Sequence, residues 1–332
     1  MTAAIRPERL LRELSELWAQ SAQEPGSAGH EVLRACSMTL MVLTASSPDK
    51  PEMTETLGAL IPVYPCRLIV IEVAGGPERR LEASVRAHCW RTFGSRRQVC
   101  IEQVHLRAAA GAVADLPPVV RALTAPDLPV VLWCIQMDLL DLDGAGPLLQ
   151  TAGKVIVDSH GAEPGAAFNR IETLRSRGLL VADLAWTRLT RWRELLAQTF
   201  ASCAGAGPYE VEKITVAHTG SAPGAEALYL AGWLRDAFAN RPACVFTAAE
   251  TPGEQAGGGI VAAAIEGPAL TLTLSTLGEG GVEVRVGESV SWTRIEPRDE
   301  TSLLKEELAI EGPDPVFERA LREAANLTRQ LR

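Results

Sequence analysis

The fold of this chain is decided by the run Arg67-Leu-Ile-Val-Ile-Glu-Val73, which is almost wholly apolar. A strand with this composition is buried on both faces, because helices cover both sides of the sheet in α/β proteins. The run therefore predicts a strand in the middle of a sheet.

The sequence on both sides of this run alternates between helical and strand patterns. Periodicity predicts helices over residues 7–20, 29–36, 51–61, 114–123, 145–151 and 164–177. Apolar or alternating runs predict strands over residues 38–43, 81–90, 99–106, 129–135 and 154–158. Apolar and polar residues alternate cleanly in 81–90, so this strand has one exposed face, and 99–106 is its expected sheet neighbour. We therefore expect an N-terminal mixed α/β sheet domain with flanking helices.

A chain of 332 residues exceeds the usual ceiling for one core, so two domains are expected. The run Gly205-Ala-Gly-Pro208 is the predicted boundary, which gives an N-terminal domain over 1–204 and a C-terminal domain over 205–332. The second domain is expected to be a smaller α+β domain with an antiparallel meander. Its predicted elements are strands at 211–217, 260–266, 269–276 and 282–287 and helices at 224–239, 300–309 and 314–331.

The composition limits the classes of partner. The formal net charge of −9 opposes general affinity for nucleic acid or an anionic membrane, so we expect neither as a partner. No uncharged apolar run reaches the roughly 18 residues that a membrane-spanning helix needs. We expect a cytoplasmic protein.

Motifs that carry chemistry are missing from the sequence. The run Gly144-Ala-Gly-Pro-Leu-Leu149 begins like a dinucleotide fingerprint but lacks the third glycine. The seven cysteines are scattered without zinc-ligand spacing, and we expect them to be inert, mostly buried thiols without a disulfide. We therefore expect no catalytic residue, no metal and no cofactor.

One segment carries residue types that favour binding, Asp183-Leu-Ala-Trp-Thr-Arg-Leu-Thr-Arg-Trp-Arg-Glu-Leu-Leu-Ala-Gln-Thr-Phe200. It reads as one amphipathic helix with Asp183 as its N-cap. Arg193 falls inside the apolar arc, so it must pair with an internal carboxylate or meet a partner, and the internal pair is narrowly favoured. The candidate partner-binding residues of this segment are Trp186, Arg188, Arg191, Trp192 and Arg193.

A weaker candidate is a small-ligand site. Asp158 and Ser159 end a predicted buried strand, where α/β sheets place ligands, and Arg67 begins another. The competing interpretations are that Asp158 and Ser159 cap the next helix, which we favour, and that Arg67 anchors its strand to a neighbouring acid.

Several of these blocks resemble one known family. The segment from Asp183 to Gln198 is similar to the signature segment of the glucose-6-phosphate dehydrogenase assembly protein family, OpcA. Further blocks resemble family segments in the same order, namely Pro65 to Ile71, Asp127 to Trp133 and Lys154 to Ser159, and so does the later run Leu230-Ala-Gly-Trp-Leu234.

The resemblance implies a non-catalytic accessory protein of carbohydrate metabolism. Such a protein binds glucose-6-phosphate dehydrogenase and promotes its assembly or allosteric activation in the oxidative pentose phosphate pathway. Two alternatives stay open: a sugar-phosphate-binding enzyme or sensor that uses Arg67 and Asp158, and a self-associating structural protein.

Overall fold

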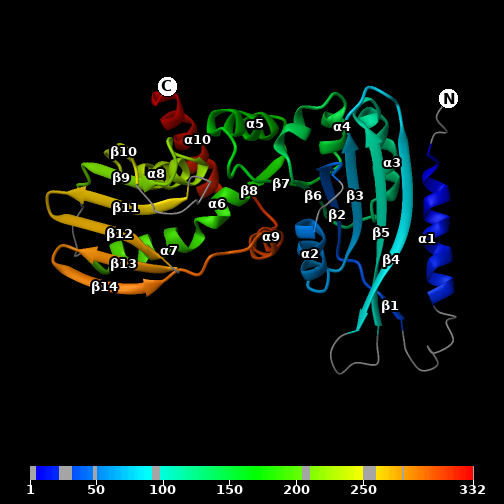
Figure 1. Ribbon diagram of the computed structural model, residues 1–332, viewed down its shortest axis with the longest axis horizontal. Helices are drawn as coiled ribbons and strands as arrows, with labels where there is room; N and C mark the ends of the chain where they lie inside the picture. The colour runs from blue at the N-terminus through cyan, green and yellow to red at the C-terminus, as the bar shows by residue number, and fades with distance from the viewer. Residues whose placement is uncertain are drawn as a thin grey trace. The chain divides into compact units, whose positions relative to one another are not determined.

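The structure is a computed structural model that describes residues 5–21, 32–47, 51–91, 98–203, 210–249, 259–278 and 280–331. The chain divides into two compact units, shown in Figure 1. The first unit contains Met1–Asp158 and Gly178–Ala182, and the second contains Ser159–Arg177 and Asp183–Arg332. The predicted boundary at residues 204/205 lies outside the described residues. The chain passes between the units earlier, at residues 158/159, 177/178 and 182/183.

The first unit is built on an eight-stranded sheet, which we call sheet A. Seven strands follow the order β1-β5-β3-β2-β6-β7-β8, and β4 pairs with the outer side of β5. The pairs β1/β5, β5/β3, β3/β2, β2/β6 and β6/β7 are parallel, whereas β4/β5 is antiparallel. The strands are β1 Val32–Arg34, β2 Met38–Ala45, β3 Cys66–Ala74, β4 Leu81–Arg91, β5 Gln98–Ala109, β6 Val130–Cys134, β7 Lys154–Val157 and β8 Leu180–Asp183. The mixed α/β sheet expected from the sequence is thereby confirmed.

Strand β3 is the buried central strand that the sequence predicts. Every residue from Cys66 to Val73 is buried, and only Ala74 is exposed. The helix predicted over 29–36 is wrong where the structure describes it, because residues 32–34 form strand β1 beside β5. Pairing with a distant strand overrides the local helical pattern there.

Helices of the first unit flank sheet A (Figure 1). They are α1 Pro7–Ser21, α2 Pro51–Leu60, η1 Ala110–Asp115, α3 Leu116–Leu123, η2 Met137–Asp141 and α4 Ala145–Leu149. Helix α1 contacts β4 and α3, and η1 contacts β3 and β5.

The second unit combines a helical core with a six-stranded sheet, sheet B, whose order is β10-β9-β11-β12-β13-β14. Strands β9 and β10 are parallel, and the rest form the predicted antiparallel meander. The strands are β9 Lys213–His218, β10 Ala243–Ala248, β11 Ile260–Gly267, β12 Leu270–Gly278, β13 Gly281–Val286 and β14 Ser289–Arg294. The helices are α5 Pro164–Ser176, α6 Leu184–Arg188, α7 Thr190–Cys203, α8 Ala225–Ala237, α9 Glu300–Ala309 and α10 Pro315–Gln330.

Helices α8 and α10 pack closely because α8 has a glycine at their contact. A Cβ atom on Gly232 would lie 2.9 Å from the carbonyl oxygen of Ala320 and 2.9 Å from the amide nitrogen of Ala324. A side chain at this position would therefore push the two helices apart.

The segment from Asp183 to Phe200 differs from the single helix that its periodicity predicts. It forms two helices, α6 and α7, with Leu189 between them. The predicted N-cap is confirmed, because the Asp183 carboxylate accepts a hydrogen bond from the amide of Ala185 at 3.0 Å.

Candidate functional site

A fully buried carboxylate lies at the N-terminus of α6 in the second unit. The side chain of Asp183 is 0% exposed. Its Oδ1 accepts from the amides of Ser159 and Ala185, and its Oδ2 accepts from the Ser159 hydroxyl at 2.5 Å and the Tyr229 hydroxyl at 2.8 Å. These donors are what make a buried charge tolerable, and they join α6 to α8 and to the segment before α5.

Burial changes the acid–base chemistry of Tyr229. Its hydroxyl is fully buried, and desolvation raises its pKa well above the ordinary value, with the Asp183 charge adding to the effect. Tyr229 therefore stays protonated and acts as a hydrogen-bond donor. Ser159 is a weak candidate for a ligand contact, because its amide and its hydroxyl both donate to Asp183.

A second polar cluster is partly open to solvent. His160 Nδ1 lies 2.6 Å from Glu226 Oε1, and Arg188 Nη1 lies 3.5 Å from the same oxygen. Glu226 is buried, with 6% of its side chain exposed, whereas 39% of the His160 side chain is exposed. Among the described residues Glu226 Oε2 has no hydrogen-bond partner. Of the five candidate partner-binding residues, Arg188 is thus engaged by an acid of its own unit.

The two tryptophans of the candidate segment lie in the core. Trp186 is 3% exposed and Trp192 is 8% exposed. The Trp186 ring packs against Tyr229 and Phe317, and its Nε1 donates to Asp314 Oδ2 at 3.1 Å. Neither ring is available as a contact for another protein without a rearrangement of this core.

Arg193 is held inside its own unit, although by a ring and not by a carboxylate. Its guanidinium lies 3.7 Å from the centroid of the Trp186 ring, and its Nη2 donates to the Thr190 hydroxyl. Among the described residues no carboxylate forms an ion pair with it, so the predicted internal ion pair is replaced by a cation–π contact. Burial lowers the pKa of Arg193, and nearby carboxylates led by Asp314 and Glu306 oppose this shift.

Arg191 is the member of the candidate set that faces solvent. Its side chain is 62% exposed and pairs with Glu194 at 2.8 Å on the same helix. It is therefore the exposed residue of the set, whereas Arg188 and Arg193 are half-buried.

The residues of the weaker ligand site lie apart. Arg67, at the start of β3, donates to Glu102 Oε2 and to the carbonyl oxygen of Leu123, both at 2.7 Å. Asp158 follows the end of β7. Strands β3 and β7 run in the same direction through β2 and β6, so the start of β3 and the end of β7 lie at opposite ends of the strands, and the two residues cannot share one small ligand. Arg67 anchors its strand to a neighbouring acid, which is the alternative interpretation.

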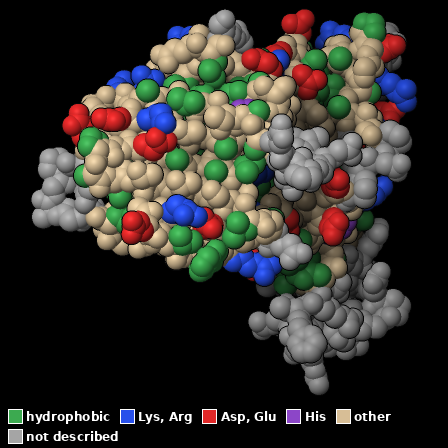
Figure 2. All heavy atoms as spheres, turned by 60° about the vertical axis from the view of Figure 1, so that its left-hand side comes forward, with side chains coloured by type: hydrophobic (Ala, Val, Ile, Leu, Met, Phe, Trp, Pro, Cys, Tyr) green, Lys and Arg blue, Asp and Glu red, His purple; other side chains and the backbone are tan. Residues whose placement is uncertain are grey.

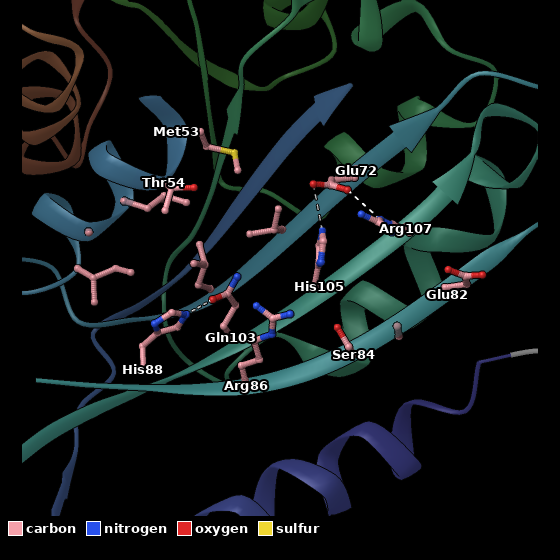
Figure 3. A pocket seen from close by; sticks show the side chains of 16 residues that line it. Met53, Thr54, Glu72, Glu82, Ser84, Arg86, His88, Gln103, His105 and Arg107 are labelled. Atoms are coloured by element: carbon pink, nitrogen blue, oxygen red, sulfur yellow. Dashed lines mark hydrogen bonds and ion pairs between the residues drawn. The ribbon is translucent and has the colours of Figure 1, made fainter. Parts of the chain in front are cut away.

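The first unit contains a groove that sequence patterns did not indicate (Figure 3). Its volume is about 660 Å³. One wall is apolar and comes from α2, its following turn and β3, with Met53, Leu57, Ile61, Leu68 and Val70. The polar residues on β3, β4 and β5 complete the lining.

The polar lining of this groove follows the strand register. Across β3, β5 and β4 the aligned rows are Leu68–Gln103–Arg86, Val70–His105–Ser84 and Glu72–Arg107–Glu82. Glu72 accepts from Arg107 Nε at 3.1 Å and lies 3.3 Å from His105 Nε2. His88 bonds to Gln103 (Figure 3).

Sheet B has one buried face and one open face. The side chains on the buried face are almost completely buried. They are Ile214, Val216, Ala263, Ile265, Leu272, Leu274, Val282 and Val284. The opposite face, which we call the open face, is formed by two aligned rows, Thr247–Ala217–Ala262–Ser275–Glu283–Trp292 and Val245–Thr215–Ala264–Thr273–Arg285–Val290. Trp292 is 68% exposed. In the view of Figure 2, acidic and basic side chains are scattered over the face turned forward, with apolar side chains between them.

The cysteines differ from the expectation at one pair. Cys89 and Cys100 form a disulfide, because the β4/β5 register places them directly opposite each other. The expectation of free, buried thiols holds for Cys66 and Cys134. Burial raises the pKa of the Cys66 thiol to about 12 and also raises the pKa of Cys134.

The described part of the chain offers neither a metal cluster nor a membrane span. No group of three or more His, Cys, Asp or Glu side chains there is arranged to hold a metal ion. No helix there is both long and apolar enough to cross a membrane.

Comparison with known families gives two adjacent matches. Residues 59–173 match the N-terminal domain of the glucose-6-phosphate dehydrogenase subunit family, and residues 180–321 match its C-terminal domain. The two matches meet between 173 and 180, close to where the compact units exchange the chain.

Individual relatives agree with this assignment, and one solved structure shares the fold. A Nostoc punctiforme protein named as the OxPP cycle protein OpcA is 31% identical over 51% of this chain, and its Synechococcus elongatus namesake is 28% identical over 54%. The matches span only 37% and 40% of the lengths of these two relatives. An oxidoreductase from Sinorhizobium meliloti superposes with a TM-score of 0.50 at 9% identity, covering 87% of this chain and 95% of that chain, which is a likeness of fold alone. Because both domains of one family follow each other along the sequence, this chain belongs to the OpcA family of glucose-6-phosphate dehydrogenase subunits.

Proposed function

We propose that this chain is a non-catalytic accessory protein that binds a glucose-6-phosphate dehydrogenase and promotes its assembly or allosteric activation. The observation that carries the proposal is the ordered match of both domains of the family, which together extend over residues 59–173 and 180–321. Binding activates an enzyme only when the active conformation or oligomer is bound more tightly than the inactive one.

The open face of sheet B is the proposed docking surface for the dehydrogenase. Its large exposed side chain is Trp292, and exposed tryptophan is enriched at the energetic centres of protein interfaces. The aligned rows carry the charges of Glu283 and Arg285, which pair with each other at 2.8 Å and so leave little net charge. A surface of mostly small side chains with an exposed aromatic residue on its edge strand and little net charge suits a flat, uncharged patch of a partner protein.

The occupant we assign to this face is the dehydrogenase, because the face lies within residues 180–321, the part that matches the family's C-terminal domain. The alternative surface is the exposed side of α7, where Arg191 lies. One pair of variants, Trp292→Ala and Arg191→Glu, distinguishes between the two surfaces.

The experiment is co-purification of the full chain with the dehydrogenase from the same organism, followed by an assay of dehydrogenase activity with and without the chain. Trp292→Ala is expected to weaken binding by about 2 kcal/mol, roughly 30-fold, while leaving the melting temperature unchanged. Arg191→Glu is the control and is expected to bind and activate like the parent.

Four outcomes contradict the proposal or a part of it. Failure of the parent chain to bind or activate the dehydrogenase rejects the function. Nicotinamide reduction by the isolated chain, in proportion to its concentration, rejects the non-catalytic assignment. Loss of binding in Arg191→Glu but not in Trp292→Ala moves the docking surface to α7, and a Trp292-dependent dimer of the isolated chain assigns the open face to self-association.

A further inference from the structure

The groove beneath α2 has the dimensions of a small-molecule site. Its volume of about 660 Å³ falls within the range of roughly 300–1,000 Å³ that is typical of ligand pockets. One wall is apolar, with Met53, Leu57 and Ile61, and the opposite wall consists of polar side chains of β4 and β5. Such pockets combine apolar surface with a few placed polar groups that fix the orientation of a ligand.

The stability of sheet A does not require polar side chains in the groove. The opposite face of β5 carries Val104, Leu106 and Ala108, which are all buried. On the groove side the same strand carries Gln103, His105 and Arg107, which point toward the cavity in Figure 3. Glu72, on the central strand β3, is only 9% exposed, and placing a charge there costs free energy that an apolar residue would not.

The charges of the groove are balanced except at one residue. Glu72 is paired with Arg107 at 3.1 Å, and Glu82 is paired with Arg80 at 2.5 Å. Arg86 projects from β4 into the groove and forms no ion pair among the described residues. The groove therefore has an uncommitted guanidinium, which is the group that binds phosphate and carboxylate with two parallel hydrogen bonds.

A second group in the groove also has unused hydrogen-bonding capacity. His105 Nε2 is buried and lies 3.3 Å from Glu72 Oε1, but it makes no hydrogen bond of good geometry within the described residues. His105 and Ser84 face each other across the β4/β5 pair, next to the row that contains Arg86. This nitrogen points toward Glu72 (Figure 3), and a ligand hydroxyl that reaches it would satisfy it.

We propose that this groove binds a small organic anion, with its phosphate or carboxylate group at Arg86 and its hydroxyl-bearing body against Ser84, Gln103 and His105. The apolar wall from α2 and β3 excludes water from the remaining side of the ligand. The site lies within the first unit, so binding there does not require the dehydrogenase.

The test is isothermal titration calorimetry of the isolated full chain with four probes at low salt. The probes are glucose 6-phosphate, gluconate, neutral glucose and inorganic phosphate. We expect heat from glucose 6-phosphate or gluconate and none from glucose, and the comparison of the first two decides whether the anion is a phosphate or a carboxylate. Affinity is expected to fall as salt is added, because the exposed Arg86 charge is screened.

Two variants of equal charge change locate the site. Arg86→Met is expected to weaken binding at least tenfold, because it removes the uncommitted guanidinium and keeps the length of the side chain. Arg121→Met removes an exposed arginine from α3, which does not line the groove, and is expected to bind like the parent. His105→Phe fills part of the groove, and it is expected to weaken binding by more than tenfold.

The proposal is overturned if neither anionic probe binds at concentrations up to about 10 mM, which corresponds to less than about 3 kcal/mol of affinity. It is also overturned if Arg86→Met binds as tightly as the parent, or if neutral glucose binds as well as its phosphate. The dehydrogenase is not present in this titration, so these outcomes are distinct from those that reject the proposed function.

Discussion

The buried hydrogen bond between Tyr229 and Asp183 gives a stability change that follows directly from the structure. Tyr229→Phe removes the hydroxyl that donates to Asp183 Oδ2 at 2.8 Å and leaves the ring in place. That ring lies 4.9 Å from the Phe168 ring and 5.9 Å from the Trp186 ring, and phenylalanine keeps both contacts. The substitution therefore removes the hydrogen bond to the buried charge, together with the contact between the Tyr229 and Ser159 hydroxyls, and leaves the packing of the ring intact.

The expected cost is larger than that of an average hydrogen bond. Hydrogen bonds to charged groups contribute about 1.5–3 kcal/mol, and Asp183 is fully buried, so water cannot replace the lost donor. Because Ser159 donates both its amide and its hydroxyl to the same carboxylate, the charge stays partly satisfied and the second unit stays folded. We expect Tyr229→Phe to lower the free energy of unfolding by about 2 kcal/mol.

The pH dependence follows from the raised pKa of Tyr229. The unfolded chain loses the tyrosine proton near pH 10, whereas the folded chain retains it because burial raises the pKa well above that value. The stabilising contribution is therefore fully present below about pH 10 and falls as the pH rises further, by about 1.4 kcal/mol per pH unit for one proton. Phenylalanine has no proton to lose, so the difference between parent and variant is expected to narrow above about pH 10.

Urea denaturation between pH 7 and pH 11 measures both effects, and hydrogen exchange of the Ser159 and Ala185 amides reports on the network itself. Ser159→Ala is the matched variant, and the double variant, which removes both hydroxyl donors of Oδ2, is expected to lose more than the sum of the single losses. The reasoning is refuted if Tyr229→Phe unfolds at the parent's urea concentration, or if the difference between the two proteins is independent of alkaline pH.

Two further predictions concern covalent and packing features. A non-reducing peptide map is expected to join the peptides that carry Cys89 and Cys100, and replacing both with serine is expected to cost about 2–4 kcal/mol; recovery of both as free thiols from protein kept without reductant would contradict the pairing. Gly232→Ala is expected to destabilise the chain by about 1–3 kcal/mol, because its Cβ would lie 2.9 Å from backbone atoms of α10. Gly58→Ala in α2, where a Cβ meets nothing within 4 Å, is the control and is expected to be neutral or stabilising, so equal losses in both variants would disprove the packing argument.

Local periodicity predicted the strands whose buried and exposed residues follow a regular pattern. The apolar run of β3 is buried from Cys66 to Val73, and the alternation in 81–90 matches the half-exposed strand β4. These predictions succeed because the period of two along a strand assigns each side chain to one face, and the apolar pattern marks which faces are covered. Strands β10 and β14, which lie at the two edges of sheet B, were not among the predicted elements, although Ala243-Cys-Val245 has a strand-like apolar pattern and β14 alternates apolar and polar residues.

The groove and the disulfide depend on strand register, which the sequence does not display. A shift of one residue between β4 and β5 would separate Cys89 from Cys100 and would turn His105 away from Ser84. The sequence indicated that 81–90 and 99–106 pair, but local patterns offer no means of aligning them. For the same reason Arg86 was recognised only as a residue on the exposed face of a strand.

The position of Arg193 shows a different kind of limit. The helical wheel correctly placed it on the same side as Trp186, and the guanidinium does lie over that ring at 3.7 Å. Its other surroundings come from α9 and α10, far along the chain, where Glu306, Glu307 and Asp314 lie near it. The carboxylates are present, but Glu306 is paired with Arg298, and Asp314 caps α10 and accepts from Trp186. A local pattern can reveal that a buried cation needs compensation, but not which group supplies it.

The two proposed sites lie in different units, and thermodynamics links them whatever the arrangement of the units. If an anion in the groove changes the affinity of the chain for the dehydrogenase by some factor, the dehydrogenase must change the affinity for the anion by the same factor. An anion that binds the free chain and the complex equally well has no influence on assembly, however tightly it binds. The titration that tests Arg86, repeated on the complex, therefore separates a metabolite-responsive activator from a protein whose groove and docking face act independently.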